Sequence, residues 1–214
     1  MSRTLVVGDL HGCYDELVEL VGRVRLAESD RLVCVGDLVT KGRKSREVLE
    51  LFMRDARYSS VLGNHDRALL EYWTGLRKKR ELKPAQRKCA KRLKDGRDRF
   101  AEFLAGLPGF LDLGSHVVVH AGLRPGVPLA EQSLDDLTAL RTLGEDRESR
   151  EGTPWYEVYE GEKVALFGHW PAAEPRRGPR AVGLDTGCVY GGRLTAYVVE
   201  TGEFVSVPAL RDYA

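Results

Sequence analysis

The stretch Val61-Leu62-Gly63-Asn64-His65-Asp66 lies at a corner where a predicted strand turns into a predicted helix. Residues 58–62 form a strand-like run, and the apolar pairs at 69–70 and 72–73 have helical spacing. An asparagine beside a histidine at such a corner offers an oxygen ligand for a metal ion, with a proton donor next to it. A four-residue motif is weak evidence for a metal site by itself. The interpretation therefore depends on whether the rest of the chain provides further ligands.

The same order of strand, loop and helix occurs twice before this corner. Residues 3–7 form an apolar run that ends in Gly8-Asp9, and residues 31–35 form another that ends in Gly36-Asp37. The apolar spacing predicts amphipathic helices over 13–26 and 45–56. Three such units in a row are typical of parallel βαβ structure.

The second half of the chain has a different pattern. Short β runs alternate with glycine-rich turns, and a short helix is predicted over 134–143. The β runs are 110–113, 116–120, 163–167, 180–184, 193–199 and 203–207. We expect this half to be mostly antiparallel, so that residues 1–214 form a single α/β domain of two β-sheets with helices outside.

The composition is that of a globular protein without a membrane span. Of 214 residues, 43% are hydrophobic and 30% are charged, which is enough for one large core. No apolar run approaches the roughly 18 residues of a spanning helix, and residues 1–9 lack a signal-peptide pattern. Four scattered cysteines without a C-x-x-C pair indicate a reducing, cytoplasmic setting.

One segment of the chain is strongly cationic. Residues 77–99 contain 12 Lys or Arg against 3 Asp or Glu, although the formal charge of the whole chain is only +1. We expect a basic helical insertion at about 73–107, which is either an electrostatic funnel for a polyanion or a solvated helical hairpin. Few aromatic residues lie within it, which gives little support to base stacking.

Side chains with ligand chemistry follow five of the predicted strands. Sites in open α/β sheets collect at the carboxyl ends of the strands, so we expect these side chains to meet. Four of the five histidines lie at such ends, beside glycine or a carboxylate. The candidate metal ligands are Asp9, His11, Asp37, Asn64, His120 and His169.

This mixed set of oxygen and imidazole ligands suits Mn²⁺, Fe, Co²⁺ or Zn²⁺ better than Ca²⁺. It is too large for one catalytic ion that keeps open coordination positions, whereas two ions that share one carboxylate use it well. Two ions roughly 3.5–4 Å apart hold a bridging hydroxide and clamp the oxygens of an in-line displacement. The sequence therefore predicts a dinuclear metal centre.

These motifs resemble those of the calcineurin-like metallophosphoesterases, in the phosphoprotein-phosphatase branch. The resemblance rests on residues 8–12, 36–42, 63–66, 120–125, 168–169 and 185–192. It implies a metallophosphoesterase fold, in which two mixed β-sheets pack as a sandwich flanked by helices. It also implies two divalent ions, with Mn²⁺ as the expected metal and Co²⁺, Fe or Zn²⁺ as alternatives.

The resemblance further implies a role for each ligand. Asp9 and His11 bind the first ion, Asp37 bridges both ions, and the second ion is bound by Asn64, His120 and His169. His65 is implied to be the general acid that protonates the leaving oxygen. We include the adjacent Asp66 in the catalytic set, at a position where the protein phosphatases of this branch usually have Glu.

Two residues depart from the pattern of the branch. Thr40 stands where the family has the aspartate that pairs with the acid histidine, so Asp66 or another group must orient His65. Lys41 stands where the family has an arginine that grips phosphate with two donors, which a lysine cannot reproduce. The expected substrate-binding residues are Lys41, Arg43, Arg141 and Tyr190, the last as a rim residue that can stack on a base.

These departures, together with Phe167-Gly168-His169-Trp170, look most like the symmetrical diadenosine tetraphosphatases and the related ApaH-like phosphatases. The implied activity is hydrolysis of phosphoanhydride bonds in dinucleoside polyphosphates such as diadenosine tetraphosphate, or in related polyphosphates, by in-line attack of a metal-bridging hydroxide. Capped RNA 5′ ends and phosphoproteins stay open as substrates. The alternatives are a serine/threonine protein phosphatase and a non-catalytic phosphate- or RNA-binding module. The intact ligand set argues against the module.

Overall fold

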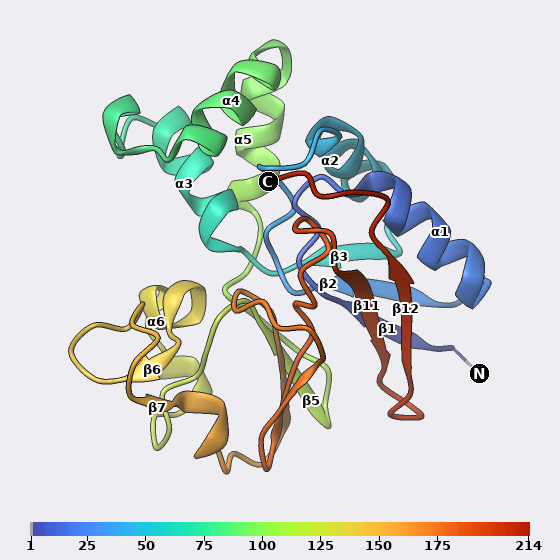
Figure 1. Cartoon of the computed structure of the whole chain (residues 1–214), viewed down its shortest axis with the longest axis vertical. Helices are drawn as coiled ribbons and strands as arrows, with labels where there is room; N and C mark the ends of the chain where they lie inside the picture. Colours follow the sequence, from blue (N-terminus) through green and yellow to red (C-terminus); the bar gives the residue numbers. More distant parts are fainter. Residues whose placement is uncertain (1) are drawn as a thin grey trace.

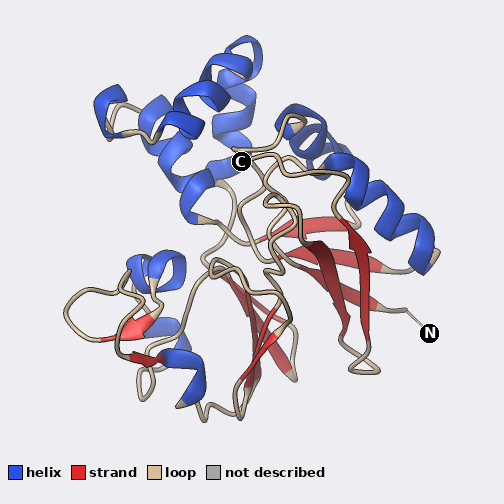
Figure 2. Cartoon of the chain, viewed as in Figure 1, coloured by secondary structure: helices blue, strands red, loops and turns tan. Residues whose placement is uncertain are grey.

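The first β-sheet is formed by the strands of the three predicted strand–loop–helix units and by the two strands of a C-terminal hairpin (Figures 1 and 2). The computed structural model describes residues 2–214. The strands of this sheet are β1 (Thr4–Val7), β2 (Arg31–Cys34), β3 (Tyr58–Ser60), β11 (Arg193–Val198) and β12 (Phe204–Pro208). Their order is β12-β11-β1-β2-β3, in which β1, β2 and β3 are parallel, as expected, and the hairpin is antiparallel.

Two amphipathic helices cover the outer face of the first sheet (Figure 1). They are α1 (Tyr14–Val24) and α2 (Ser45–Arg54), and each ends two residues before its predicted end. Leu17 of α1 and Leu49 of α2 lie in one buried cluster with Leu32 and Cys34 of β2. The helical spacing of their apolar residues therefore places both helices on the sheet.

The second β-sheet has parallel strands at its centre. Its strands are β4 (Phe110–Asp112), β5 (His116–Val119), β8 (Val164–Phe167), β9 (Arg176–Arg177) and β10 (Ala181–Gly183), in the order β4-β5-β8-β10-β9. The pairs β5–β8 and β8–β10 are parallel, and only the outer pairs β4–β5 and β9–β10 are antiparallel. The expectation of a mostly antiparallel second half was therefore wrong at the sheet centre. Strands buried on both faces, such as β5, give continuous apolar runs.

A crossover segment joins the parallel strands β5 and β8. It contains α6 (Leu134–Ala139), β6 (Thr142–Leu143) and β7 (Thr153–Pro154). The helix predicted over 134–143 ends early, because Thr142 and Leu143 pair with Thr153 and Pro154 in a small hairpin.

The helix α3 (Asn64–Trp73) and the basic segment that follows it form a helical layer beside the first sheet (Figure 1). The other helices of this layer, α4 (Pro84–Arg92) and α5 (Arg97–Ala105), lie in the basic segment. Pro84 occupies the first turn of α4, where a missing N–H costs nothing. Phe100 and Leu104 anchor α5 in the same buried cluster as Leu69 of α3. Among the described helices, none has the length and apolar character that crossing a bilayer requires.

The two sheets pack face to face through alternate side chains of their strands. Val6 and Val33 from the first sheet lie in one buried cluster with Val118 and Leu166 from the second. Their neighbours in sequence point to the opposite faces, because side chains alternate along a strand; Phe167, for example, lies in the cluster outside the second sheet. This packing brings the carboxyl ends of β1, β2, β3, β5, β8 and β10 to one edge of the sandwich.

Candidate metal centre

The predicted ligands meet where the carboxyl ends of the strands converge. Backbone hydrogen bonds join the loops: the N–H of His11 donates to Asp37 O at 2.7 Å, and the N–H of Gly168 donates to His120 O at 2.8 Å. The backbone N–H of His169 donates to Asp9 Oδ1 at 3.1 Å, which connects β8 to β1 across the two sheets. The six side chains expected from sequence therefore lie in one cluster, in which all are buried except the half-buried Asn64.

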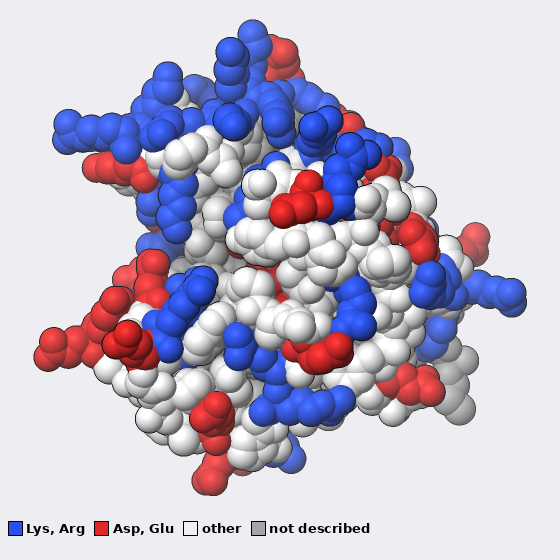
Figure 3. All heavy atoms as spheres, in the orientation of Figure 1, with Lys and Arg blue, Asp and Glu red and all other residues white. Residues whose placement is uncertain are grey.

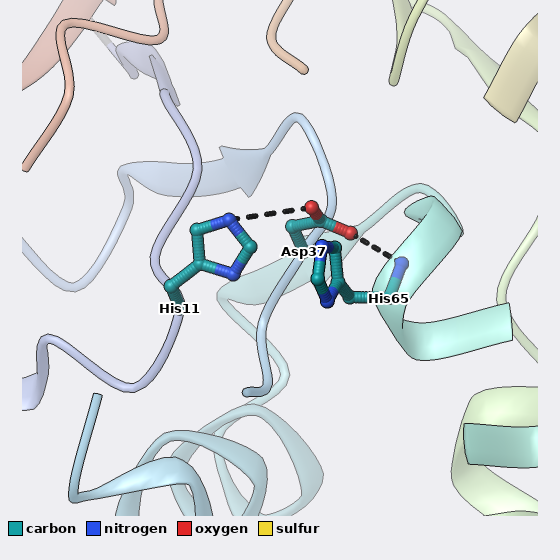
Figure 4. Close-up of side chains that lie close together, drawn as sticks. All are labelled: His11, Asp37 and His65. Atoms are coloured by element: carbon teal, nitrogen blue, oxygen red, sulfur yellow. Dashed lines mark hydrogen bonds and ion pairs between the residues drawn. The ribbon is translucent and has the colours of Figure 1, made fainter. Parts of the chain in front are cut away.

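One half of the cluster is formed by His11 and Asp37, with Asp9 beside them. His11 Nε2 lies 3.4 Å from Asp37 Oδ2 and 4.0 Å from Asp9 Oδ2. Figure 4 shows the imidazole of His11 turned toward the Asp37 carboxylate, whose Oδ1 accepts a hydrogen bond from the backbone N–H of His65 at 2.8 Å. The Asp37 carboxylate thus faces two elements at once.

The other half of the cluster is formed by Asn64 and two histidines. Asn64 Oδ1 lies 2.9 Å from His120 Nε2 and 3.0 Å from His169 Nδ1. His120 Nε2 also lies 3.6 Å from Asp37 Oδ1. Asp37 is therefore the side chain that the two halves share, which is the place the resemblance gave to a bridging ligand.

The tautomers of two histidines direct lone pairs into the cluster. His11 Nδ1 lies 3.0 Å from Val39 O, and His120 Nδ1 lies 2.9 Å from Val35 O. Because a carbonyl oxygen only accepts, each Nδ1 must be the N–H donor, and each Nε2 carries its lone pair. The lone pair of His120 Nε2 then faces the oxygens of Asn64 and Asp37, an arrangement of acceptors that a bound cation stabilises.

Burial lowers the pKa values of the histidines in the cluster and raises the pKa of Asp9. Burial lowers the pKa values of His11, His120 and His169, so these imidazoles are neutral and able to act as ligands. Burial, with Asp185 and Asp37 nearby, raises the pKa of Asp9 well above its usual range. Neutral imidazoles around crowded, desolvated carboxylates are chemically complementary to divalent cations, so the residues present fit the two ions that the family implies.

The hydroxyl of Thr40 is the closest partner of the predicted acid. Thr40 Oγ1 lies 2.8 Å from His65 Nδ1, and Gln86 Nε2 from α4 lies 3.5 Å from the same nitrogen. Burial, together with the nearby cations Lys41 and Lys83, lowers the pKa of His65 to about 4, although the Asp37 carboxylate acts to raise it. A hydroxyl orients the ring without the added negative charge that an aspartate would place there.

Asp66 contacts the backbone of the site through its side chain. Its carboxylate is fully buried and accepts hydrogen bonds from the backbone N–H groups of Leu38, Val39 and Gly63, each at 3.2 Å. These bonds tie the loop that carries Asp37 to the start of α3. In the structure the Asp66 side chain thus positions the backbone of the site, and its membership of the catalytic set stays a prediction.

A cavity of about 430 Å³ opens over the cluster and receives most of the expected substrate-binding residues. Lys41, Arg141 and Tyr190 line it, and the Lys41 ammonium lies 4.9 Å from the centre of the Tyr190 ring. The buried Arg141 Nε has no hydrogen-bond partner within residues 2–214, so it is available to an anion. Arg43 is exposed and is not among the described residues that line the cavity, so its role in substrate binding stays a prediction.

Sequence reasoning missed several residues that line this cavity, among them the charged Lys83, Glu148, Arg150 and Asp185. Asp185 follows β10, and burial raises its pKa to about 6. Its place after a short strand, like that of Asp9 and Asp37, was a signal that could have found it. Lys83 and Arg150 lie in segments far from any motif, so their approach to the site depends on the tertiary fold.

Left-handed backbone conformations gather at this site. Within residues 2–214, six residues other than glycine have positive φ, and five of them are in the cluster or its cavity. They are His11, Asp37, Thr40, Lys41 and His169. Such conformations are costly for residues with a Cβ and are usually kept where function requires them.

The sequence of the chain is similar to sequences of known proteins. Residues 2–201 match the family described as calcineurin-like phosphoesterase. The chain is 32% identical to the asymmetrical bis(5′-nucleosyl)-tetraphosphatase PrpE of Bacillus subtilis (strain 168), over 97% of this chain and 95% of that protein. It is 29% identical to the symmetrical bis(5′-nucleosyl)-tetraphosphatase of Vibrio parahaemolyticus, over 97% of this chain and 99% of that protein.

A solved structure is similar over nearly the same span. It is a crystal structure described as a candidate diadenosine tetraphosphatase, with 36% sequence identity and a TM-score of 0.85. The match covers 97% of this chain and 93% of that chain. The same arrangement of sheets and helices therefore recurs in a protein of similar sequence.

Replacing Asp66 by asparagine should destabilise the metal-free protein by about 1–3 kcal/mol, because the new amide group faces buried N–H donors. We would measure this by urea unfolding in the presence of a chelator. The control is Asp15→Asn, which removes a partly exposed carboxylate that pairs with Lys44 and should cost no more than about 1 kcal/mol. Unchanged stability of Asp66→Asn, with only turnover lost, would favour a direct catalytic role instead.

Proposed function

The chain belongs to the calcineurin-like phosphoesterase family, and from that membership we propose that it hydrolyses phosphoanhydride bonds of dinucleoside polyphosphates such as diadenosine tetraphosphate. The family match confirms the resemblance found in the motifs, and the protein is accordingly a metallophosphoesterase and a hydrolase. The two-sheet fold is likewise confirmed. The relatives are named as bis(5′-nucleosyl)-tetraphosphatases, and the proposal extends that activity to this chain.

The observation that carries the proposal is the ring of cationic side chains around the ligand cluster. Lys41, Lys83, Arg141 and Arg150 line the same cavity as His65, and the only acids among its described lining residues outside the ligand cluster are Glu148 and Asp185. Four cations exceed what one phosphate monoester needs, whereas a chain of phosphates can contact all of them. Tyr190, with 46% of its surface exposed, offers a flat face to a base at the rim.

Two divalent ions, held by the six ligands described above, would lower the pKa of a water molecule and neutralise charge on the phosphate undergoing attack. We propose Mn²⁺ as the native metal, with Co²⁺, Fe or Zn²⁺ as alternatives, because the ligands combine carboxylate and amide oxygens with imidazole. His11 faces the first position with Asp9, and His120 and His169 face the second with Asn64.

The chain's own residues have separate tasks in this proposal. Lys41 and Arg141 bind non-bridging oxygens and stabilise the negative charge that spreads in the transition state. His65 donates a proton to the leaving oxygen, with Thr40 fixing the plane of its ring. Within residues 2–214, His65 Nε2 has no protein hydrogen-bond partner, so it is the ring nitrogen left for this transfer.

The alternative of a serine/threonine protein phosphatase has less support, because the relatives that match nearly the whole chain carry tetraphosphatase names. The site gives no support to the alternative of a non-catalytic binding module, because its set of candidate metal ligands is complete.

Cysteines 13, 34, 89 and 188 are buried and free. Free thiols support the proposal of a reducing, cytoplasmic setting.

The substrate class is tested by comparing kcat/KM under Mn²⁺ for diadenosine tetraphosphate, inorganic polyphosphate and a phosphothreonine peptide. We expect the dinucleotide to exceed the peptide by at least about tenfold, or ~1.4 kcal/mol of transition-state stabilisation. A peptide that is the best substrate would overturn the proposal in favour of the protein phosphatase.

The products show which phosphoanhydride bond is broken. The symmetrical cleavage predicted from the motifs converts diadenosine tetraphosphate into two molecules of ADP, which anion-exchange chromatography separates from other nucleotides. Products of ATP and AMP would contradict symmetrical cleavage and give this chain the asymmetrical specificity named for its Bacillus subtilis relative.

The acid role of His65 is tested through the leaving group. His65→Asn should lower kcat far more for a poor leaving group such as an alkyl phosphate than for p-nitrophenyl phosphate, which leaves without protonation; a general acid typically contributes about 10²–10⁴-fold. Thr40→Ala, which removes the partner of Nδ1, should show a smaller loss of the same kind. Equal losses for both substrates would rule out His65 as the acid.

A further inference from the structure

A second cavity lies on the basic helical layer, formed by α3, α4 and the turns that flank α4. Its volume is about 620 Å³, within the range of roughly 300–1,000 Å³ that is usual for small-molecule sites. Six cationic side chains line it: Lys79, Arg87, Lys88, Lys91, Lys94 and Arg97. No acidic residue is among the described residues of its lining. We call this cavity the α4 groove.

The charges of the α4 groove are not neutralised by the protein. Elsewhere on the same layer arginines pair with carboxylates, as Arg67 and Arg77 do with Glu71. Within residues 2–214, the only cation of the groove in an ion pair is Arg97, with the exposed Asp98. In Figure 3, Lys and Arg side chains gather at the end of the molecule where α4 and α5 lie. Cations held together without counter-charges favour a polyanionic ligand.

The wall of the groove is aromatic and apolar. Tyr72 and Trp73, at the end of α3, line it together with Leu82 and Ala90. Tyr72 is half-buried and Trp73 is buried. Aromatic residues are scarce within 77–99, but the packing of α3 against α4 brings these two to the basic side chains. The groove therefore combines phosphate-binding charge with a surface on which a base can stack.

The α4 groove is separate from the metal centre. Lys83, Pro84 and Ala85 at the start of α4 line the catalytic cavity, and Gln86 approaches His65. The next residues, Arg87 and Lys88, with Lys91 one turn later, point into the groove instead. Gln86 projects from the face of α4 opposite to Lys88 and Lys91. Pro84 and Ala85 reach the catalytic cavity from the first turn of the helix, and no described residue lines both cavities.

We propose that the α4 groove is a second binding site, for a nucleoside polyphosphate. The phosphate chain lies along Lys88, Lys91 and Lys94, and the base packs against Tyr72. This site does not depend on which phosphate compound the metal centre hydrolyses, because it uses none of the ligands or cavity residues of that centre. It goes beyond an electrostatic funnel, since a funnel concentrates an anion without holding its base.

The test is isothermal titration of the full, Mn²⁺-loaded chain with adenosine 5′-(β,γ-imido)triphosphate. Wild type should bind one more equivalent than Lys88→Glu/Lys91→Glu, or bind the nucleotide at least roughly tenfold more tightly where only one site is resolved. The matched control is Lys78→Glu/Arg80→Glu, which makes the same charge change at exposed residues of the same segment that do not line the groove. The control should bind as wild type does.

A second pair of measurements separates the base from the phosphates. Tyr72→Leu should weaken binding of the nucleotide and leave binding of inorganic tripolyphosphate unchanged. Circular dichroism and p-nitrophenyl phosphate turnover should match wild type in all variants, and Lys88→Gln/Lys91→Gln replaces the charge reversal where that variant fails to fold. Equal nucleotide binding by wild type and the groove variant, an equal loss in the control, or binding of single-stranded RNA without the nucleotide would overturn the proposal.

Discussion

The rest of the site depends on the contacts of one group, the Asp37 carboxylate. One oxygen faces His11, and the other faces His120 while accepting the backbone N–H of His65. A single side chain thus joins both halves of the ligand cluster and the start of α3. Because it is buried, its charge is tolerated only with cations or donors around it: burial acts to raise the pKa of Asp37, but the surrounding histidines hold it well below its usual range.

Close backbone packing makes this arrangement possible. A Cβ at Gly63 would collide with the backbone and carboxylate of Asp37, and one at Gly168 would collide with Asp9. The loops can approach one another only because these positions lack side chains. Asp66 then fixes the loop of Asp37 through three backbone N–H groups. Close packing of the backbone therefore fixes the positions from which Asp37 and Asp9 project into the site.

The convergence of the candidate ligands was predictable from sequence because each lies within a few residues of the end of a strand, as Asp9 does for β1 and Asn64 for β3. Contacts that depend on tertiary structure could not be predicted from the sequence. The parallel pairing of β5 with β8 depends on a crossover of more than forty residues. The partnership of Thr40 with His65 needs a left-handed backbone with φ of 78° at a β-branched residue.

The central claim is that two ions share Asp37. Its most direct measurement is anomalous diffraction at the manganese edge from crystals grown with Mn²⁺. We predict two peaks roughly 3.5–4 Å apart, one beside His11 and one between Asn64 and His120, with Asp37 bound to both. The Lys41 ammonium lies 2.8 Å from His11 Nε2, so we expect it to move away when His11 binds an ion. A single peak, or two peaks that do not share Asp37, would contradict the account.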